Sequence, residues 1–135
     1  MANVHFALEL QRRLEAAGSP VQSLVAHPGF AHTDLQATSA RQTDGGRSQR
    51  FYHVAVRRVG MSPAQGALSQ LRAATDPGAR GGELYTPRWV NSGPPDRRPI
   101  TGWSSNASEM TTLWEVSERE TGIEFDVAAL VEATR

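Results

Sequence analysis

The chain has 135 residues, the size of a single domain, and its 14 basic and 14 acidic residues give a net charge of zero. This balance excludes a global attraction to nucleic acid or to an anionic membrane. The absence of cysteine excludes disulfides and thiolate metal sites, and since every basic residue is arginine, no lysine amine can take part in catalysis. The sequence has no apolar run near 18 residues and no basic-then-apolar leader, so we expect a cytoplasmic protein that does not enter a membrane.

The first predicted element is a helix over residues 2–17. Apolar side chains recur every three or four positions and predict one buried face. The members of this apolar stripe are Ala7, Leu10, Leu14 and Ala17, widened by Val4, Phe6 and Leu8. The polar positions are expected on the outer face, and they are Glu9, Gln11, Arg12, Arg13 and Glu15. Gly18 and Pro20 end the helix.

A short strand is predicted over residues 21–27, because this apolar segment ends at Pro28-Gly29. The next segment gives the least clear pattern. Residues 36–49 are polar, with Gly45-Gly46 in the middle, and favour a loop. Residues 51–56 fit a short helix and a short strand equally well.

A second helix is predicted from the N-cap Ser62 and the following Pro63 to about Ala74. Its apolar stripe consists of Ala64, Ala67, Leu68 and Leu71. A second strand is predicted over residues 83–86, closed by Pro87, and residues 88–105 are rich in Pro, Gly and Ser and predict a loop.

The last predicted helix begins after Asn106, where Glu109 three residues later gives a pattern similar to a capping box. Met110, Leu113 and Trp114 share one face of this helix, which we expect to face the core. It ends near residues 121–122, and residues 126–135 are assigned to a tail. We therefore predict one domain segment over 1–125, followed by that tail.

This order of helices and strands indicates an α/β fold with a parallel sheet. Only two strands are predicted, however. Parallel strands are normally buried on both faces, and a sheet of two strands is marginal in water. We expect an architecture of two strands and three to four helices that is incomplete as a stand-alone domain.

Five short blocks occur in a fixed order along the chain. They are Ala2-Asn3 with residues 6–14 (FALELQRRL), His27-Pro28-Gly29 with Thr33, residues 66–68 (GAL) with 71–77 (LRAATDP), residues 81–85 (GGELY) with Pro87, and residues 113–118 (LWEVSE) with Thr121-Gly122. Together they resemble the C-terminal portion of the short-chain dehydrogenase/reductase family, close to its retinol-dehydrogenase-like bacterial members. The first block is similar to the stretch that follows the catalytic Tyr-x-x-x-Lys of that family.

The resemblance implies the C-terminal part of a Rossmann-type, doubly wound parallel sheet. It also implies an oxidoreductase that uses NAD or NADP and acts on a small alcohol or carbonyl substrate. The second block is similar to the loop that closes over the nicotinamide end of the cofactor. On this basis the candidate cofactor-binding residues are Pro28, Gly29, Phe30 and Thr33. The alternative for Thr33 is a cap on the following helical turn.

The departures from the family pattern concern the reactive residues. Tyr52 is followed four positions later by Val56, and Tyr85 by Trp89, so neither forms a Tyr-x-x-x-Lys motif. The Gly-rich turn at residues 78–82 joins a helix to a strand and not a strand to a helix, so it does not match the family's phosphate turn. We therefore expect no catalytic residue in this chain, weak cofactor binding and no turnover by the chain alone.

By alignment, the missing lysine of the family would immediately precede Met1. We expect the chain to be a C-terminal piece that arose from a miscalled start, a frameshift or a genuine truncation. A second hypothesis is an interaction module that self-associates or pairs with a complementary N-terminal half or a full-length relative. Its basis is the wide apolar face of residues 2–17 and the unpaired strand edge expected at 21–27. A third is a small protein that binds an apolar ligand.

Other chemistry has little support in the sequence. The four histidines lack helical metal-ligand spacing, and no Gly-x-Ser-x-Gly motif supports Ser/His/Asp hydrolysis. The arginines between residues 41 and 58 are expected to lie on a solvated loop and not to bind nucleic acid. Trp89 and Trp103 fall in the predicted loop and either line a substrate pocket or cover the core.

Overall fold

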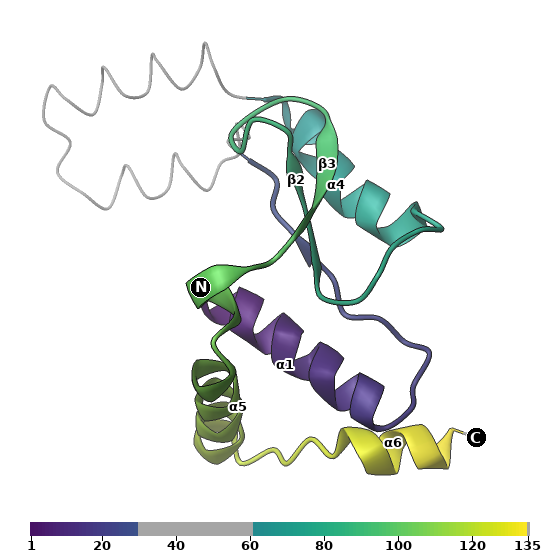
Figure 1. Ribbon diagram of the computed structural model, residues 1–135, viewed down its shortest axis with the longest axis vertical. Helices are drawn as coiled ribbons and strands as arrows, with labels where there is room; N and C mark the ends of the chain where they lie inside the picture. The colour runs from purple at the N-terminus through teal and green to yellow at the C-terminus, as the bar shows by residue number, and fades with distance from the viewer. Residues whose placement is uncertain (30–60, 135) are drawn as a thin grey trace, which may run out of the picture. The chain divides into compact units, whose positions relative to one another are not determined.

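The computed structural model describes residues 1–29 and 61–134. Figure 1 shows the elements of this part of the chain. They are α1 (Ala2–Ala16), β1 (Val25–Ala26), α4 (Pro63–Thr75), β2 (Glu83–Pro87), β3 (Pro95–Pro99), a 3-10 turn η1 (Gly102–Ser105), α5 (Ala107–Thr121) and α6 (Val127–Ala133). The predicted loop at 36–49, the segment 51–56 and the arginines between 41 and 58 lie outside the described residues. Among the described helices, none has the length and apolar character needed to cross a membrane.

The strands form an open three-stranded sheet in the order β1-β2-β3. Gly82 N–H donates to the Ser23 carbonyl at 2.9 Å, and His27 N–H donates to the Tyr85 carbonyl at 2.8 Å. Residue numbers thus rise in the same direction along both strands, so β1 and β2 are parallel. β3 returns antiparallel to β2 through the turn 88–94, which Arg88 N–H closes onto the Pro94 carbonyl at 2.9 Å. The predicted α/β class is confirmed.

The strand predictions needed two corrections. β1 covers only Val25–Ala26, less than the predicted 21–27. β3 and η1 both lie within residues 88–105, which were predicted to be loop. The sequence of β3 is Pro-Asp-Arg-Arg-Pro, and proline and charged residues are usually scarce in strands. They are tolerated here because β3 is an edge strand of the sheet.

The chain divides into two compact units. The first contains Met1–Val25, Pro77–Leu84 and the described part of Arg98–Arg135. The second contains the described part of Ala26–Asp76, together with Tyr85–Arg97. Each unit has its own packing.

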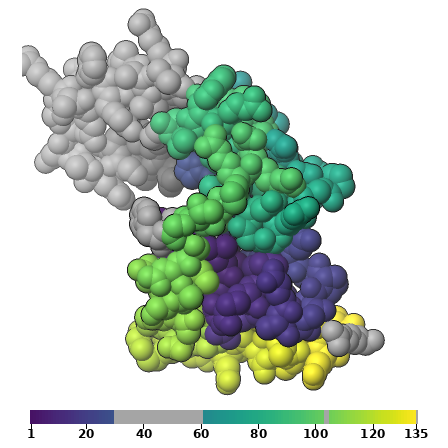
Figure 2. Space-filling view, in the orientation of Figure 1, coloured from purple at the N-terminus to yellow at the C-terminus, as the bar shows by residue number. Residues whose placement is uncertain are grey.

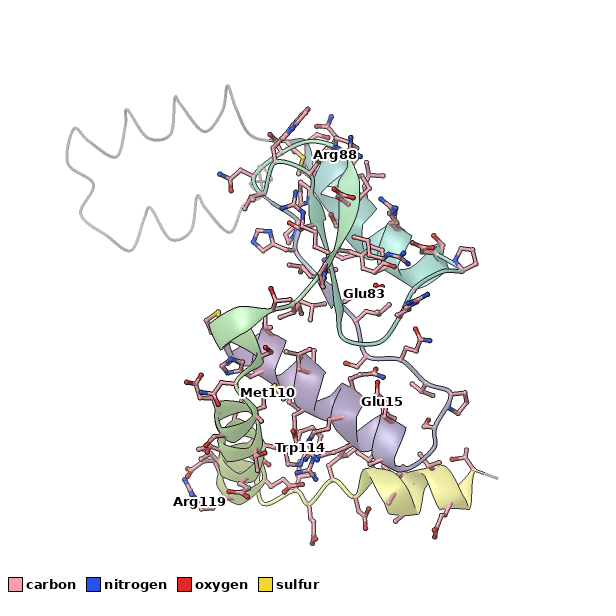
Figure 3. The ribbon with its side chains drawn as sticks, viewed as in Figure 1. Glu15, Glu83, Arg88, Met110, Trp114 and Arg119 are labelled. Atoms are coloured by element: carbon pink, nitrogen blue, oxygen red, sulfur yellow. The ribbon has the colours of Figure 1, made fainter. Side chains whose placement is uncertain are left out.

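In the first unit, α1 packs against α5 and α6 (Figures 1 and 2). Trp114 is 2% exposed and forms a core cluster with Leu14 and Val127. Figure 3 shows Trp114 and Met110 on the side of α5 that faces α1, and both are buried as predicted. The Trp114 ring stacks on Phe6 with 5.2 Å between ring centroids. The residues predicted to form a tail include α6, whose Val127 completes this core.

Two polar residues of α1 were predicted on its outer face but are buried. The side chain of Glu9 is 0% exposed and accepts hydrogen bonds from Arg12 and Arg13. The side chain of Gln11 accepts a hydrogen bond from Ser23 N–H at 2.7 Å. It fits because Gly81, in the same unit, has no side chain, and a Cβ atom there would collide with Gln11. Both side chains can be buried because they are hydrogen-bonded, and a pattern of apolar residues does not predict such bonds.

In the second unit, α4 lies beside β2 and β3 (Figure 1). Ser62 and Gln65 form a capping box at the start of the helix, and Asp76 caps its end. The Tyr85 hydroxyl donates to Asp76 Oδ2 at 3.2 Å, which connects β2 to the end of α4. The predicted apolar stripe of α4 is not its buried face: Leu71 is 57% exposed, whereas the buried positions are Gly66 and Ser69.

Candidate functional site

The structure describes two of the four predicted cofactor-binding residues. Pro28 and Gly29 follow β1 after one intervening residue, His27, at the carboxyl end of this parallel strand. Phe30 and Thr33 lie outside the described residues. Pro28 and Gly29 belong to the second unit, and so does the turn 88–94 that follows β2.

Gly29 is packed tightly against the loop that follows β2. Its φ is +71°, a conformation that residues with a side chain rarely adopt. A Cβ atom at this position would lie 2.8 Å from the Asn91 carbonyl oxygen, 2.8 Å from Pro87 Cγ and 3.0 Å from Met61 Cε. Gly29 N–H donates to His27 Nδ1 at 3.0 Å. Glycine is therefore required here both by the backbone conformation and by the close approach of the neighbouring loop.

The turn 88–94 contains an unusual backbone conformation. Val90 has φ +68°, and among the described residues it is the one non-glycine residue with a positive φ. For an L-residue this conformation costs about 1–2 kcal/mol, and Val is β-branched. Val90 N–H donates to the Pro87 carbonyl at 2.8 Å, and Asn91 N–H donates to the Trp89 carbonyl at 2.7 Å. Strained residues of this kind are concentrated at functional sites.

An open hollow of about 440 Å³ lies between α4 and this turn, within the second unit. Its lining consists of Met61, Gln65, Leu68, Trp89, Ser92, Gly93 and Pro94. Trp89 is 68% exposed. The sequence indicated Trp89 as a possible pocket residue, but it gave no signal for the strained Val90, because positive φ is usually marked by Gly, Asn or Asp.

A second hollow, of about 580 Å³, lies in the first unit. Residues of α1, the turn 19–21 and the segment 125–134 line it, and they are Leu10, Leu14, Ser19, Pro20, Val21, Phe125, Val127, Leu130, Val131 and Thr134. Its polar side chains are the two hydroxyls of Ser19 and Thr134. This surface can hold an apolar group, but it has no acid, base or cation with which to act on one.

Two titratable residues of the first unit, Glu9 and His5, are buried. Hydrogen bonds from Arg12 hold the pKa of Glu9 below its ordinary value, with a further contribution from Arg13, although burial acts in the opposite direction. Nε2 of His5 lies 3.7 Å from Glu109 Oε2, between α1 and α5. His32 and His53 lie outside the described residues. Within the part that is described, no three His, Asp or Glu side chains are grouped so that they could hold a metal ion.

No protein-family model matches the chain, and no curated protein matches it. Among solved structures, the crystal structure of an uncharacterised protein from Mycobacterium paratuberculosis is similar to it. The similarity covers 92% of this chain at 32% sequence identity, with a TM-score of 0.59. The chain spans 37% of the length of that protein. Its fold is therefore similar to one portion of a larger protein.

Proposed function

We propose that the chain is the C-terminal segment of an NAD(P)-dependent short-chain dehydrogenase/reductase with a Rossmann-type sheet, acting on an alcohol or carbonyl substrate. In this role the turn at Pro28 and Gly29, with Phe30 and Thr33, holds the nicotinamide end of NAD or NADP. The phosphate turn and the Tyr-x-x-x-Lys pair belong to the part of the enzyme that this sequence does not contain.

Two observations on the whole chain support the proposal. The five sequence blocks follow the order of the C-terminal portion of that family, from residues 2–14 to residues 113–122. The similarity to 37% of the Mycobacterium paratuberculosis protein agrees with a segment of a longer chain.

The observation that carries the proposal is the position of Gly29. In open α/β sheets, ligands bind outside the carboxyl ends of the parallel strands. The loops after β1 and β2 both leave that edge, and Gly29 brings them into contact at Asn91 and Pro87. These contacts fix the backbone of Gly29 at this edge of the sheet, which supports a ligand-positioning role for the turn.

In this role the chain positions the cofactor and supplies no reacting group. When bound, the reduced cofactor would donate a hydride to a carbonyl carbon, and the oxidised cofactor would accept one from an alcohol carbon. Pro28 restricts the backbone before the turn, and the His27 side chain accepts the Gly29 N–H. These contacts restrict the backbone of residues 27–29, which lowers the entropy lost there when a ligand binds.

Ligand-observed NMR tests the proposal on the chain as it exists. In saturation-transfer experiments at millimolar ligand, nicotinamide mononucleotide is expected to receive saturation on its nicotinamide ring. Adenosine monophosphate serves as the matched control and is expected to receive none, because the adenine half of the family's site lies in the other part of the enzyme. Equal transfer to both, or transfer to neither, refutes the proposal.

A turnover assay tests the expected lack of chemistry. The purified chain should not oxidise NADH or NADPH in the presence of aldehydes or ketones, because it has no Tyr-x-x-x-Lys pair. Turnover that follows the protein through purification and is lost on heat denaturation contradicts this assignment.

The second candidate function is an interaction module that pairs with a complementary N-terminal half or with another copy. The exposed apolar side chains of α4, Leu68 and Leu71, favour it, and so does the edge position of β1 in the described sheet. Size-exclusion chromatography with light scattering should then show oligomers whose fraction rises with concentration. A monomer that unfolds cooperatively at all concentrations excludes self-association.

A further inference from the structure

The hollow beside α4 adjoins the Gly29 turn. Met61 belongs to both features, because its Cε atom borders the Gly29 position and the residue also lines the hollow. Trp89, Ser92, Gly93 and Pro94 form the opposite wall, and they lie in the same turn as Asn91, which contacts Gly29. The loop that fixes the Gly29 turn therefore also forms one side of a hollow of about 440 Å³, a volume typical of small-molecule sites.

Trp89 presents its ring to this hollow. The ring packs on the backbone of Gly93, where a Cβ atom would lie 2.7 Å from Trp89 Cε3. A residue with a side chain at position 93 would displace the ring. The rest of the indole remains open, since Trp89 is 68% exposed. Trp89 therefore combines a ring that packs on Gly93 with a largely exposed indole, next to the strained backbone of Val90.

We propose that this hollow is a subsite for the aromatic ring of an aryl aldehyde, an aryl ketone or the corresponding alcohol. The inference rests on the proposed function, because it assigns the substrate class to the hollow next to the Gly29 turn. Trp89 stacks on the ring of the ligand, and Leu68, which lines the hollow and is 42% exposed, provides an apolar contact. The polar side chains of the lining are Gln65 and Ser92, which can hydrogen-bond the ligand oxygen.

Amide-shift mapping with two ketones of equal carbon count tests the ring preference. The ¹⁵N-labelled chain is titrated with acetophenone and, separately, with 2-octanone. Acetophenone is expected to shift the amides of Trp89, Ser92 and Gly93 and to bind about tenfold more tightly than 2-octanone, the order of magnitude of one aromatic stacking contact. Equal affinity for the two ketones refutes the ring preference. Shifts confined to Leu130 and Val131 instead place the ligand in the other hollow and overturn the inference.

Three variants define the contact. Trp89→Ala should weaken acetophenone binding about tenfold, and Leu68→Arg should weaken it by a similar factor by placing a charge in the hollow. Leu71→Ala is the matched control, because Leu71 is an exposed apolar residue of α4 that does not line the hollow. The ¹⁵N spectrum of each variant verifies its fold. Unchanged binding in folded Trp89→Ala or Leu68→Arg contradicts the subsite, and so does an equal loss in Leu71→Ala.

The two proposals can fail separately. If acetophenone binds at Trp89 but nicotinamide mononucleotide does not bind, the hollow is a ring-binding site in a protein of another function. If the mononucleotide binds and acetophenone does not, the oxidoreductase proposal stands and the substrate class is wrong.

Discussion

Glu9 carries a charged side chain that is fully buried. Its fully buried carboxylate accepts hydrogen bonds from Arg12 at 2.6 and 2.9 Å and from Arg13 at 2.9 Å. Glu9→Gln should lower the free energy of unfolding by about 1.5–3 kcal/mol, the usual range for hydrogen bonds to a charged group. Urea unfolding followed by circular dichroism at pH 7 measures this change. Glu115→Gln, an exposed substitution on α5 of the same unit, is the control and should change stability by less than about 0.5 kcal/mol.

The lowered pKa of Glu9 predicts that the free energy of unfolding depends on pH. The pKa of Glu9 is lowered in the folded chain, so the carboxylate binds protons less readily there than in the unfolded chain. Its contribution is fully present above the ordinary value of about 4.3 and is lost as the pH falls through the lower folded-state pKa. The stability difference between the native chain and Glu9→Gln should therefore shrink below about pH 4. A difference that stays constant down to acid unfolding contradicts this account.

The strained backbone of Val90 predicts that one substitution will stabilise the chain. Asparagine tolerates positive φ better than a β-branched residue does, and Val90 is exposed, so little packing is lost on replacement. Val90→Asn should therefore raise the free energy of unfolding by about 1 kcal/mol. Val21→Asn is the matched control, an exposed valine without positive φ, and it should not stabilise. A Val90→Asn chain that is less stable in urea contradicts the strained conformation.

At the scale of elements, Trp114 joins α5 to α1. Arg13 lies over its ring at 4.4 Å, and its Nε1 donates to Glu118 Oε1 at 2.9 Å. Trp114→Ala should cost about 3–5 kcal/mol because it leaves a cavity in the core of the first unit. Trp89→Ala removes the same side chain from an exposed site and should cost less than about 1 kcal/mol. Thermal unfolding of both variants measures the contrast, and similar losses would show that the core is wrongly assigned.

Helices α1, α4 and α5 could be predicted from the sequence because local signals specify them, whereas α6 lies in residues assigned to a tail. Ser62-Pro63 marks the start of α4, and Gly18 and Gly122 follow the ends of α1 and α5. β3 could not be predicted, because its pairing with β2 depends on the turn 88–94 and not on strand propensity. The apolar stripe of α4 does not coincide with its buried face. Apolar periodicity shows that one side of a helix is apolar, but it does not show whether another element covers that side.

The candidate site was partly predictable for a similar reason. A Pro-Gly pair after an apolar strand is a local signal, so Pro28 and Gly29 could be named from the sequence. Their neighbours Met61 and Asn91 are distant along the chain, and the strained Val90 has no sequence signature. Contacts of this kind depend on tertiary packing, which one sequence without relatives does not report.

At the scale of the whole molecule, the turn proposed to position the cofactor and the hollow proposed to bind an aromatic ring lie in the second of two compact units. Core packing and buried charge belong to the other unit, which contains Glu9 and Trp114. The oxidoreductase proposal therefore depends on whether the turn at Pro28 and Gly29 binds the cofactor. Stability measurements on variants of the first unit do not test this binding.

The most direct test is to observe this turn during a titration. Amide shifts of the ¹⁵N-labelled chain are followed as nicotinamide mononucleotide is added, with adenosine monophosphate as the matched control. The account predicts that His27 and Gly29 shift with the nicotinamide ligand alone, while Leu130 and Val131 in α6 do not move. If the amide signals of His27 and Gly29 do not shift, or shift equally with both ligands, the turn does not bind nicotinamide and the proposed cofactor site is wrong.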